Sequence, residues 1–288
     1  MCEEEAILGV DLGATKIGIG KIESGRIIKT YFGDITAKAA EDHILEEVFQ
    51  SIENVFDPTV KGIGVGVPSL VDVEKGIVYD VQNIPSWKKV PLKDILENRF
   101  HAPVYVNNDA NCFAVGEKYF GKGKEFRNLA GITLGSGFGT GLIIDDCLYS
   151  GVNCGAGEFG SIPYLDKIYE YYCSGQFFLG EYGIRGEEIF TRAEQRDGEA
   201  LNIFGQFGKH IGNAVKAILF AVDPEAVIFG GSISRSFHHF QEAMWECLFE
   251  FPYKHAIDRL KILATDQPQI SILGAAALYY DARRVGQA

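Results

Sequence analysis

An aspartate directly before a glycine turn is the first residue of the chain suited to chemistry, in Asp11-Leu12-Gly13-Ala14-Thr15-Lys16. Glycine lets the backbone approach an anion closely, and successive amides form a concave anion site. A carboxylate there repels phosphate unless a metal ion lies between them, so Asp11 indicates Mg²⁺, held directly or through water. A plain β-hairpin with an aspartate cap would show the same residues.

A second turn, L-G-S-G-F-G-T-G at 134–141, has four glycines in seven residues. Each glycine weakens a strand by about 0.5–1 kcal/mol relative to alanine, so this density favours close approach of a ligand. No Gly-Lys-Ser/Thr follows, which excludes a Walker motif, and the strand that follows argues against a dinucleotide fingerprint. A tight hairpin without a ligand is the alternative.

Asp109 follows an apolar strand at the start of a helix, in V-N-N-D-A-N at 106–111. A carboxylate in this place can accept the proton of a hydroxyl group during phosphoryl transfer, as a general base. An aspartate at a helix N-terminus is more commonly a cap, and this is the alternative interpretation.

Glu158 is presented by a glycine-rich loop, G-V-N-C-G-A-G-E-F-G-S at 151–161. Carboxylates and amides are the usual partners of sugar hydroxyls, because each can accept from two adjacent groups. A surface loop is the alternative. The segment F-G-G-S-I-S at 229–234 leads from a strand toward a helix, and it suits the adenosine side of a nucleotide or an ordinary helix start.

An internal repeat organises the elements that carry these residues. Residues 7–28 and 129–150 both read as an apolar strand, a glycine turn, a second strand and a polar turn into a third strand. A shift of 122 positions places Leu12-Gly13 on Leu134-Gly135. Two halves that start alike and face each other would leave a cleft for ligands.

Strands alternate with helices along the rest of the chain, which predicts an α/β fold. Helices are expected at 39–56, 92–100, 109–120, 199–222 and 273–284, and strands at 61–68, 103–107, 226–231 and 262–264. We expect a small N-terminal domain of residues 1–108 plus about 274–288, because the last helix should pack on the first half. Residues 109–273 form the larger second domain.

Composition limits the classes of protein. The 288 residues carry a net charge of −12, from 27 Lys and Arg against 39 Asp and Glu, which is opposite to the usual balance of a nucleic-acid binder. The chain has no apolar run of about 20 residues and an acidic N-terminus, so we expect a cytoplasmic protein without membrane contact. The six cysteines include no C-x-C or C-x-x-C pair, which excludes a zinc site of that type.

The ordered motifs resemble those of the ROK family of sugar kinases from end to end. They comprise D-L-G-A-T-K at 11–16, G-V-G-V-P-S at 64–69, N-N-D-A-N at 107–111, T-L-G-S-G-F-G-T-G at 133–141, G-A-G-E-F-G at 155–160, F-G-G-S at 229–232 and I-L-G-A-A-A-L at 272–278. The resemblance implies a two-domain actin-like ATPase (ribonuclease H-like) fold with an interdomain cleft, and allows a homodimer.

The resemblance also implies roles for individual residues. Asp109 would be the catalytic base. The sugar-binding residues would be Asn108, Asp109, Glu158, Glu170, Ser69 and Ser161. The ATP-binding residues would be Asp11 (with Mg²⁺), Gly13, Thr15, Lys16, Gly135, Ser136, Gly137, Gly230 and Gly231.

One segment departs from the family pattern. The family usually continues E-x-G-H, followed by a zinc-binding cysteine cluster and a short helix with Ser-Gly. Here Ser161 replaces the histidine, and residues 162–175 lack the cluster, so we expect no zinc. Aligning Ser174-Gly175 places the last sugar-binding glutamate at Glu170, whose position must then come from packing, with tyrosines 169, 171 and 172 as candidates.

The predicted function is ATP- and Mg²⁺-dependent phosphorylation of a hexose or N-acetylhexosamine, at the 6-hydroxyl. Glucose, N-acetylglucosamine, N-acetylmannosamine and fructose remain open. A sugar-binding regulator with impaired catalysis is the main alternative, prompted by Ser161 and the missing cysteines. A DNA-binding regulator is disfavoured, because Asp11 leaves no room for a DNA-binding domain ahead of it, and N-N-D-A-N disfavours a carboxylate kinase or a nucleotide hydrolase.

Overall fold

The computed structural model describes residues 5–81 and 83–285, which form two compact units. The first unit takes its described residues from 1–125, 141–156 and 267–288, and the second from 126–140 and 157–266. Within the described residues, no helix has the length and apolar character needed to cross a membrane.

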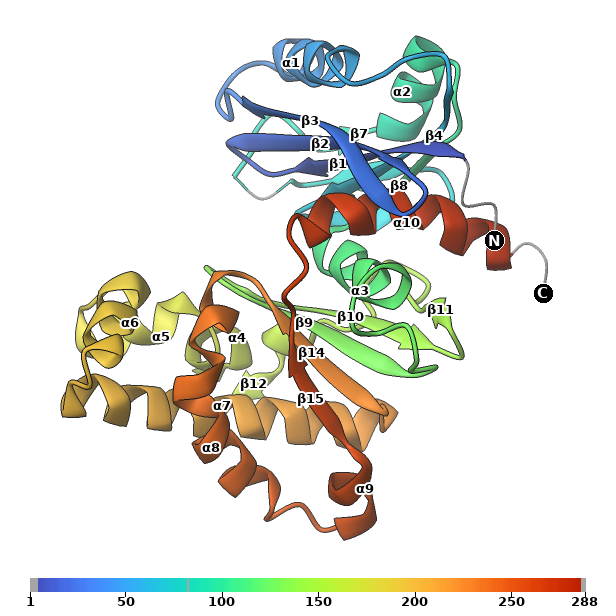
Figure 1. Cartoon of the computed structure of the whole chain (residues 1–288). Coiled ribbons are helices and arrows are strands. Elements are labelled where there is room, and N and C mark those ends of the chain that lie inside the picture. Colours follow the sequence, from blue (N-terminus) through green and yellow to red (C-terminus); the bar gives the residue numbers. More distant parts are fainter. Residues whose placement is uncertain (1–4, 82, 286–288) are drawn as a thin grey trace. The chain divides into compact units, whose positions relative to one another are not determined.

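A five-stranded sheet of order β3-β2-β1-β4-β8 forms the centre of the first unit (Figure 1). Its strands are β1 (Ala6–Leu12), β2 (Lys16–Glu23), β3 (Arg26–Asp34), β4 (Val60–Val67) and β8 (Val104–Asn108). The first three are antiparallel, whereas β4 runs parallel to both β1 and β8. Strands β1 and β4 are buried at nearly every residue, as continuous apolar strands covered on both faces are.

Helices cover both faces of this sheet. Helices α1 (Glu41–Glu53) and α2 (Leu92–Phe100) lie on one face, and α10 (Ile270–Val285) lies on the other, beside α3 (Asp109–Tyr119). Helix α10 sits directly on the strand backbones, since a Cβ atom at Gly64 would lie 1.7 Å from the carbonyl oxygen of Ala275. A small sheet of β5 (Leu70–Asp72), β6 (Ile77–Tyr79) and β7 (Lys89–Val90) completes the unit.

The second sheet has the order β11-β10-β9-β14-β15, which repeats the order of the first. Its strands are β9 (Leu129–Leu134), β10 (Phe138–Ile144), β11 (Cys147–Leu148), β14 (Ala226–Gly230) and β15 (Lys261–Ala264). Strand β14 pairs in parallel with β9 and with β15, as β4 does with β1 and β8. The internal repeat found in the sequence is therefore a repeat of sheet topology.

Six helices follow β10 in the second unit, together with the hairpin of β12 (Pro163–Tyr164) and β13 (Lys167–Ile168). They are α4 (Tyr169–Tyr172), α5 (Gly175–Tyr182), α6 (Gly186–Glu194), α7 (Gly198–Val222), α8 (Phe237–Leu248) and α9 (Lys254–Arg259). The long helix α7 packs along α8, and their contact holds much of the unit's apolar core.

The helices and strands expected from the sequence are all present, with ends that differ by a few residues. The division into units differs from the expected one, because α3 and residues 141–156 group with the first unit. Helix α3 does so because it packs closely on α10. A Cβ atom at Gly274 would lie 1.8 Å from the carbonyl oxygen of Cys112 on α3.

Candidate active site

Three parallel strands align the polar residues of the first unit. Asp11 on β1 pairs with Gly66 on β4, and Gly66 pairs with Asn107 on β8. Asp11 and the segment that starts at Asn107 therefore lie at the same edge, where the carboxyl ends of the strands meet. In open α/β sheets, ligands bind at this edge.

Asn108 caps helix α3, and Asp109 is the first residue of the helix. The side-chain oxygen of Asn108 accepts a hydrogen bond of 2.8 Å from the amide of Ala110, and its Nδ2 donates to the carbonyl oxygen of Ser69 at 3.2 Å. The Asp109 side chain is exposed and its Oδ1 also accepts from the Ala110 amide, at 2.9 Å. Asn108 is therefore the cap of this helix, and capping does not account for the aspartate at position 109.

Asn107 is buried and holds the strand end in place. Its Oδ1 accepts from the amide of Asn108 at 2.8 Å and from Nδ2 of Asn111 at 2.9 Å. Its Nδ2 donates to Oγ of Ser150 at 3.2 Å. The sequence assigned no role to Asn107, which fixes the backbone that carries Asn108 and Asp109.

Asp11 is half-buried, and burial raises the pKa of its carboxyl group, while a hydrogen bond with Ser271 on α10 lowers it. Cys112 is buried nearby, and the pKa of its thiol is raised by burial and then by the charges of Asp109 and Asp11. A partly desolvated carboxylate such as that of Asp11 fits a divalent cation, which would relieve the cost of its buried charge.

The turn between β1 and β2 is closed by its own backbone, with the amide of Gly13 donating to the carbonyl oxygen of Lys16 at 2.9 Å. Thr15 and Lys16 are exposed, and the Lys16 ammonium forms an ion pair with Asp34. Ser69 donates its hydroxyl to the carbonyl oxygen of Tyr79. The backbone carbonyl oxygen of Ser69, rather than its hydroxyl group, accepts the hydrogen bond from Asn108.

In the second unit, Glu170 on α4 is bonded to the second glycine turn. Its Oε2 accepts from the amide of Phe138 at 3.2 Å, and its Oε1 accepts from Nε2 of Gln176 at 3.1 Å. A Cβ atom at Gly137 would lie 2.8 Å from Oε2 of Glu170, so the glycine makes this approach possible. The amide of Gly175, at the start of α5, donates to the carbonyl oxygen of Gly135 at 2.8 Å.

Glu158 lies near Glu170. Glu158 is exposed, but partial desolvation of its carboxyl group raises its pKa, and the negative charge of the half-buried Glu170 raises it further. Ser161 is exposed, and its amide donates to the carbonyl oxygen of Glu158 at 3.2 Å. Two carboxylates that share one region, each with acceptor capacity left, suit a ligand that carries several hydroxyl groups.

Stacked tyrosines flank Glu170 in the chain and hold helix α4. Tyr169 stacks on Tyr164 with ring centroids 4.3 Å apart, and Tyr172 contacts Tyr164 edge to face at 5.5 Å. The hydroxyl of Tyr164 lies 3.1 Å from Nδ1 of His210 and accepts from Asn213 at 3.0 Å. The sequence named Tyr169, Tyr171 and Tyr172 as candidates for this support, and Tyr171 contacts Tyr172 edge to face at 5.0 Å. Tyr164, on the hairpin of β12 and β13, was not named.

A cavity of about 520 Å³ opens beside the second glycine turn. It is lined by Gly135, Ser136, Gly175, Gln176, Phe178, Leu179, Arg185, Gly186, Glu187, Phe190, Thr191, Phe204, Ser232, Ile233, Arg235 and Ser236. Its size is that of a typical small-molecule site. Gly230 and Gly231 directly precede Ser232, which lines the cavity. Gly231 has φ 82°, and a Cβ atom there would lie 2.3 Å from the carbonyl oxygen of Leu134, so it is required by the backbone.

Known proteins share this architecture and align with most of the chain. The ROK family model matches residues 7–282. The glucokinase of Thermotoga maritima is 28% identical over 305 residues, covering 94% of this chain and 96% of that protein. The xylose repressor of Bacillus subtilis is 28% identical over 251 residues, covering 80% of this chain and 65% of that protein.

Among solved structures, the ROK family glucokinase from Streptomyces griseus in complex with glucose and AMPPNP superposes with a TM-score of 0.78 at 28% identity, covering 95% of this chain and 98% of that chain. The duplicated sheets and these structural relatives define a two-domain actin-like ATPase fold. With the family model matching nearly the whole chain, the protein belongs to the ROK family.

Proposed function

We propose that this protein is an ATP-dependent sugar kinase that transfers the γ-phosphoryl group of ATP to the 6-hydroxyl of a hexose or an N-acetylhexosamine. The strand register of the first unit carries this proposal, because it brings Asp11 and the Asn108–Asp109 pair to one edge of the sheet. A metal-binding carboxylate and a general base are the two protein groups that phosphoryl transfer most needs. The glucokinase relatives support the same reaction.

Each residue then has a defined task. Asp109 accepts the proton of the attacking sugar hydroxyl, and Asn108, Glu158 and Glu170 hold the other hydroxyls. The amides of Gly13 and Gly135 close their own turns, so the remaining amides of the two glycine turns bind phosphate oxygens. When bound, Mg²⁺ would be held through Asp11 and would neutralise phosphate charge. The cavity beside Ser232 receives the adenosine part of ATP.

Sugar-dependent ADP release tests the function. The protein is incubated with Mg²⁺ and ATP over a panel of glucose, fructose, N-acetylglucosamine and N-acetylmannosamine. We expect turnover with at least one of them, far above the sugar-free rate. Sugar binding without turnover on any of them would contradict the kinase and favour a sugar-binding regulator, a function that the xylose repressor among its relatives makes worth testing.

Filling the cavity should separate nucleotide binding from sugar binding. Ser232→Trp places an indole in the space proposed for adenosine, so we expect the KM for ATP to rise at least about tenfold while sugar affinity stays unchanged. Leu201→Trp, on α7 but outside the cavity lining, is the matched control. An unchanged KM for ATP in the Ser232 variant would place the nucleotide elsewhere.

Sugar binding should weaken as the pH falls. The pKa of Glu158 is raised, and its ionised form accepts stronger, charge-assisted hydrogen bonds from hydroxyls than its protonated form does, so affinity falls as the pH drops through this raised pKa. Calorimetric titration of the sugar between pH 8 and pH 5 (approximate limits of ordinary stability) measures the effect. Glu158→Gln should weaken binding at neutral pH and flatten this dependence, whereas the exposed Glu246→Gln should leave it unchanged. An identical pH profile in Glu158→Gln would exclude the role of Glu158.

A further inference from the structure

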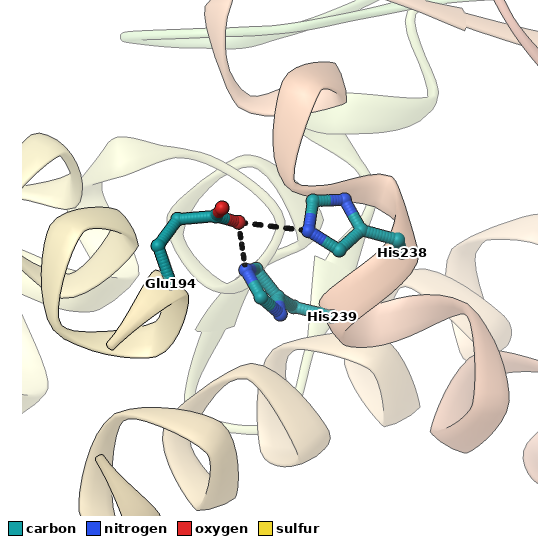
Figure 2. A group of neighbouring side chains, drawn as sticks. All are labelled: Glu194, His238 and His239. Atoms are coloured by element: carbon teal, nitrogen blue, oxygen red, sulfur yellow. Dashed lines mark hydrogen bonds and ion pairs between the residues drawn. The ribbon is translucent and has the colours of Figure 1, made fainter. Parts of the chain in front are cut away.

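Three side chains with metal-binding atoms meet at the junction of two helices of the second unit. Glu194 ends α6, and His238 and His239 lie in the first turn of α8 (Figure 2). The Oε1 atom of Glu194 lies 2.9 Å from Nε2 of His238 and 2.7 Å from Nε2 of His239. All three ligand atoms lie within 4.8 Å of one another. Both imidazoles thus point a nitrogen at the same carboxylate.

The surrounding residues hold this arrangement in place. The His239 side chain is 10% exposed, and its ring stacks on Phe204 with centroids 5.3 Å apart. The rings of His238 and His239 are 3.9 Å apart. These contacts fix the position of the His239 ring beside Glu194.

Two imidazoles and one carboxylate are a ligand set for Zn²⁺ and chemically similar divalent transition ions. With metal–ligand bonds of about 2.0–2.1 Å, tetrahedral ligand atoms are about 3.3 Å apart. The observed nitrogen–oxygen separations would therefore have to widen by roughly half an ångström, which side-chain rotation can supply. In the metal-free state Nε2 of each imidazole donates to the carboxylate, so on ion binding the proton of each ring would move to Nδ1 and leave Nε2 free for the ion.

We propose that Glu194, His238 and His239 form a binding site for Zn²⁺ that fastens α6 to α8, with solvent completing the coordination. The site is separate from the cysteine cluster of other family members, and it revises the expectation that this chain binds no zinc. Local spacing does not reveal this site, because Glu194 lies 44 residues before His238.

The site lies beside the nucleotide cavity, since Phe190 and Phe204 line the cavity and both rings also face His239, at 6.1 and 5.3 Å. Residues of α6 and the segment leading into α8 supply two walls of the same cavity. A bound ion would hold these walls at a fixed spacing. It serves a structural role, and it does not depend on the proposed kinase reaction.

Titration calorimetry with Zn²⁺ tests the site directly. The protein is prepared without a histidine tag, stripped with a chelator, kept reduced and free of nucleotide and sugar. We expect one Zn²⁺ per chain, together with a raised melting temperature that saturates at the same stoichiometry. Co²⁺ should give the intense visible absorption bands of a tetrahedral site without bands from thiolate ligands.

Variants separate this site from adventitious binding. Glu194→Gln and His238→Ala should each weaken Zn²⁺ binding by more than about tenfold, which is what loss of an outer-shell partner alone usually costs. His239→Phe keeps a ring on Phe204 and should have the same effect with the fold retained, as circular dichroism can verify. His255→Ala, an exposed histidine of α9, is the control and should bind as the wild type does. Wild-type binding no tighter than that of Glu194→Gln would overturn the proposal and leave the cluster as a hydrogen-bonded helix contact.

Discussion

Replacing Asp109 by asparagine should lower kcat by at least about 10²-fold, because general-base assistance typically contributes 10²–10⁴-fold. The amide cannot take the proton of the attacking hydroxyl, but it has the same shape and can still accept the hydrogen bond from Ala110. The cap of α3 is supplied by Asn108 and remains intact. We therefore expect the KM for the sugar to change far less than kcat, with an unchanged melting temperature.

Steady-state kinetics on the best sugar of the panel measures this effect. Asp80→Asn is the matched control, since Asp80 is an exposed aspartate of the same unit whose ion pair with Lys88 is at the surface. Exposed pairs of this kind contribute little. Turnover of the Asp109 variant within a few-fold of wild type would show that another group is the base.

Adding one methyl group at Gly64 should destabilise the first unit by at least about 3 kcal/mol, toward the upper end of the usual cost of overpacking. In Gly64→Ala the new Cβ atom would lie 1.7 Å from the carbonyl oxygen and 2.6 Å from the carbonyl carbon of Ala275. Both atoms belong to the backbone of α10, so no side chain can rotate away. The helix must move off β4 as a whole.

The fluorescence of Trp87 can report the stability of the first unit, in which Gly64 lies. The protein has two tryptophans, of which Trp87 is fully buried in the first unit and Trp245 lies on α8. In a Trp245→Phe background, urea unfolding followed by fluorescence reports the first unit. Gly155→Ala is the control substitution in the same unit, because its Cβ atom meets nothing within 4 Å. It should leave the stability of the first unit close to that of the wild type. Equal stability of Gly64→Ala and wild type would show that α10 does not lie against β4.

Local sequence patterns predicted most of the regular structure. The strand–turn–strand repeat at 7–28 and 129–150 reappears as β1–β3 and β9–β11, because apolar runs divided by glycine turns leave few other foldings. Helix α2 spans Leu92–Phe100, the predicted range. The grouping of α3 with the first unit was not predicted, since it depends on the fit of Gly116 and Gly274 between helices that are far apart in the chain.

The candidate site was predictable where its residues stand in a continuous motif, as in the segment from Asn107 to Asn111. Contacts between segments that are far apart in the sequence were not predictable. Gln176 holds Glu170, and Ser271 bonds to Asp11, but neither residue belongs to a pattern that local spacing reveals. The roles of Asp109, Glu158 and Glu170 remain predictions that rest on chemistry and family resemblance.

Identifying the phosphorylated product tests the kinase most directly. Each sugar is incubated with the protein, Mg²⁺ and ATP, and the products are separated and analysed by mass spectrometry and phosphorus NMR, with Asp109→Asn in parallel. We expect one sugar to appear as its 6-phosphate with the wild type and to remain unmodified with the variant. Release of inorganic phosphate without any sugar phosphate, or equal product from both proteins, would contradict the account.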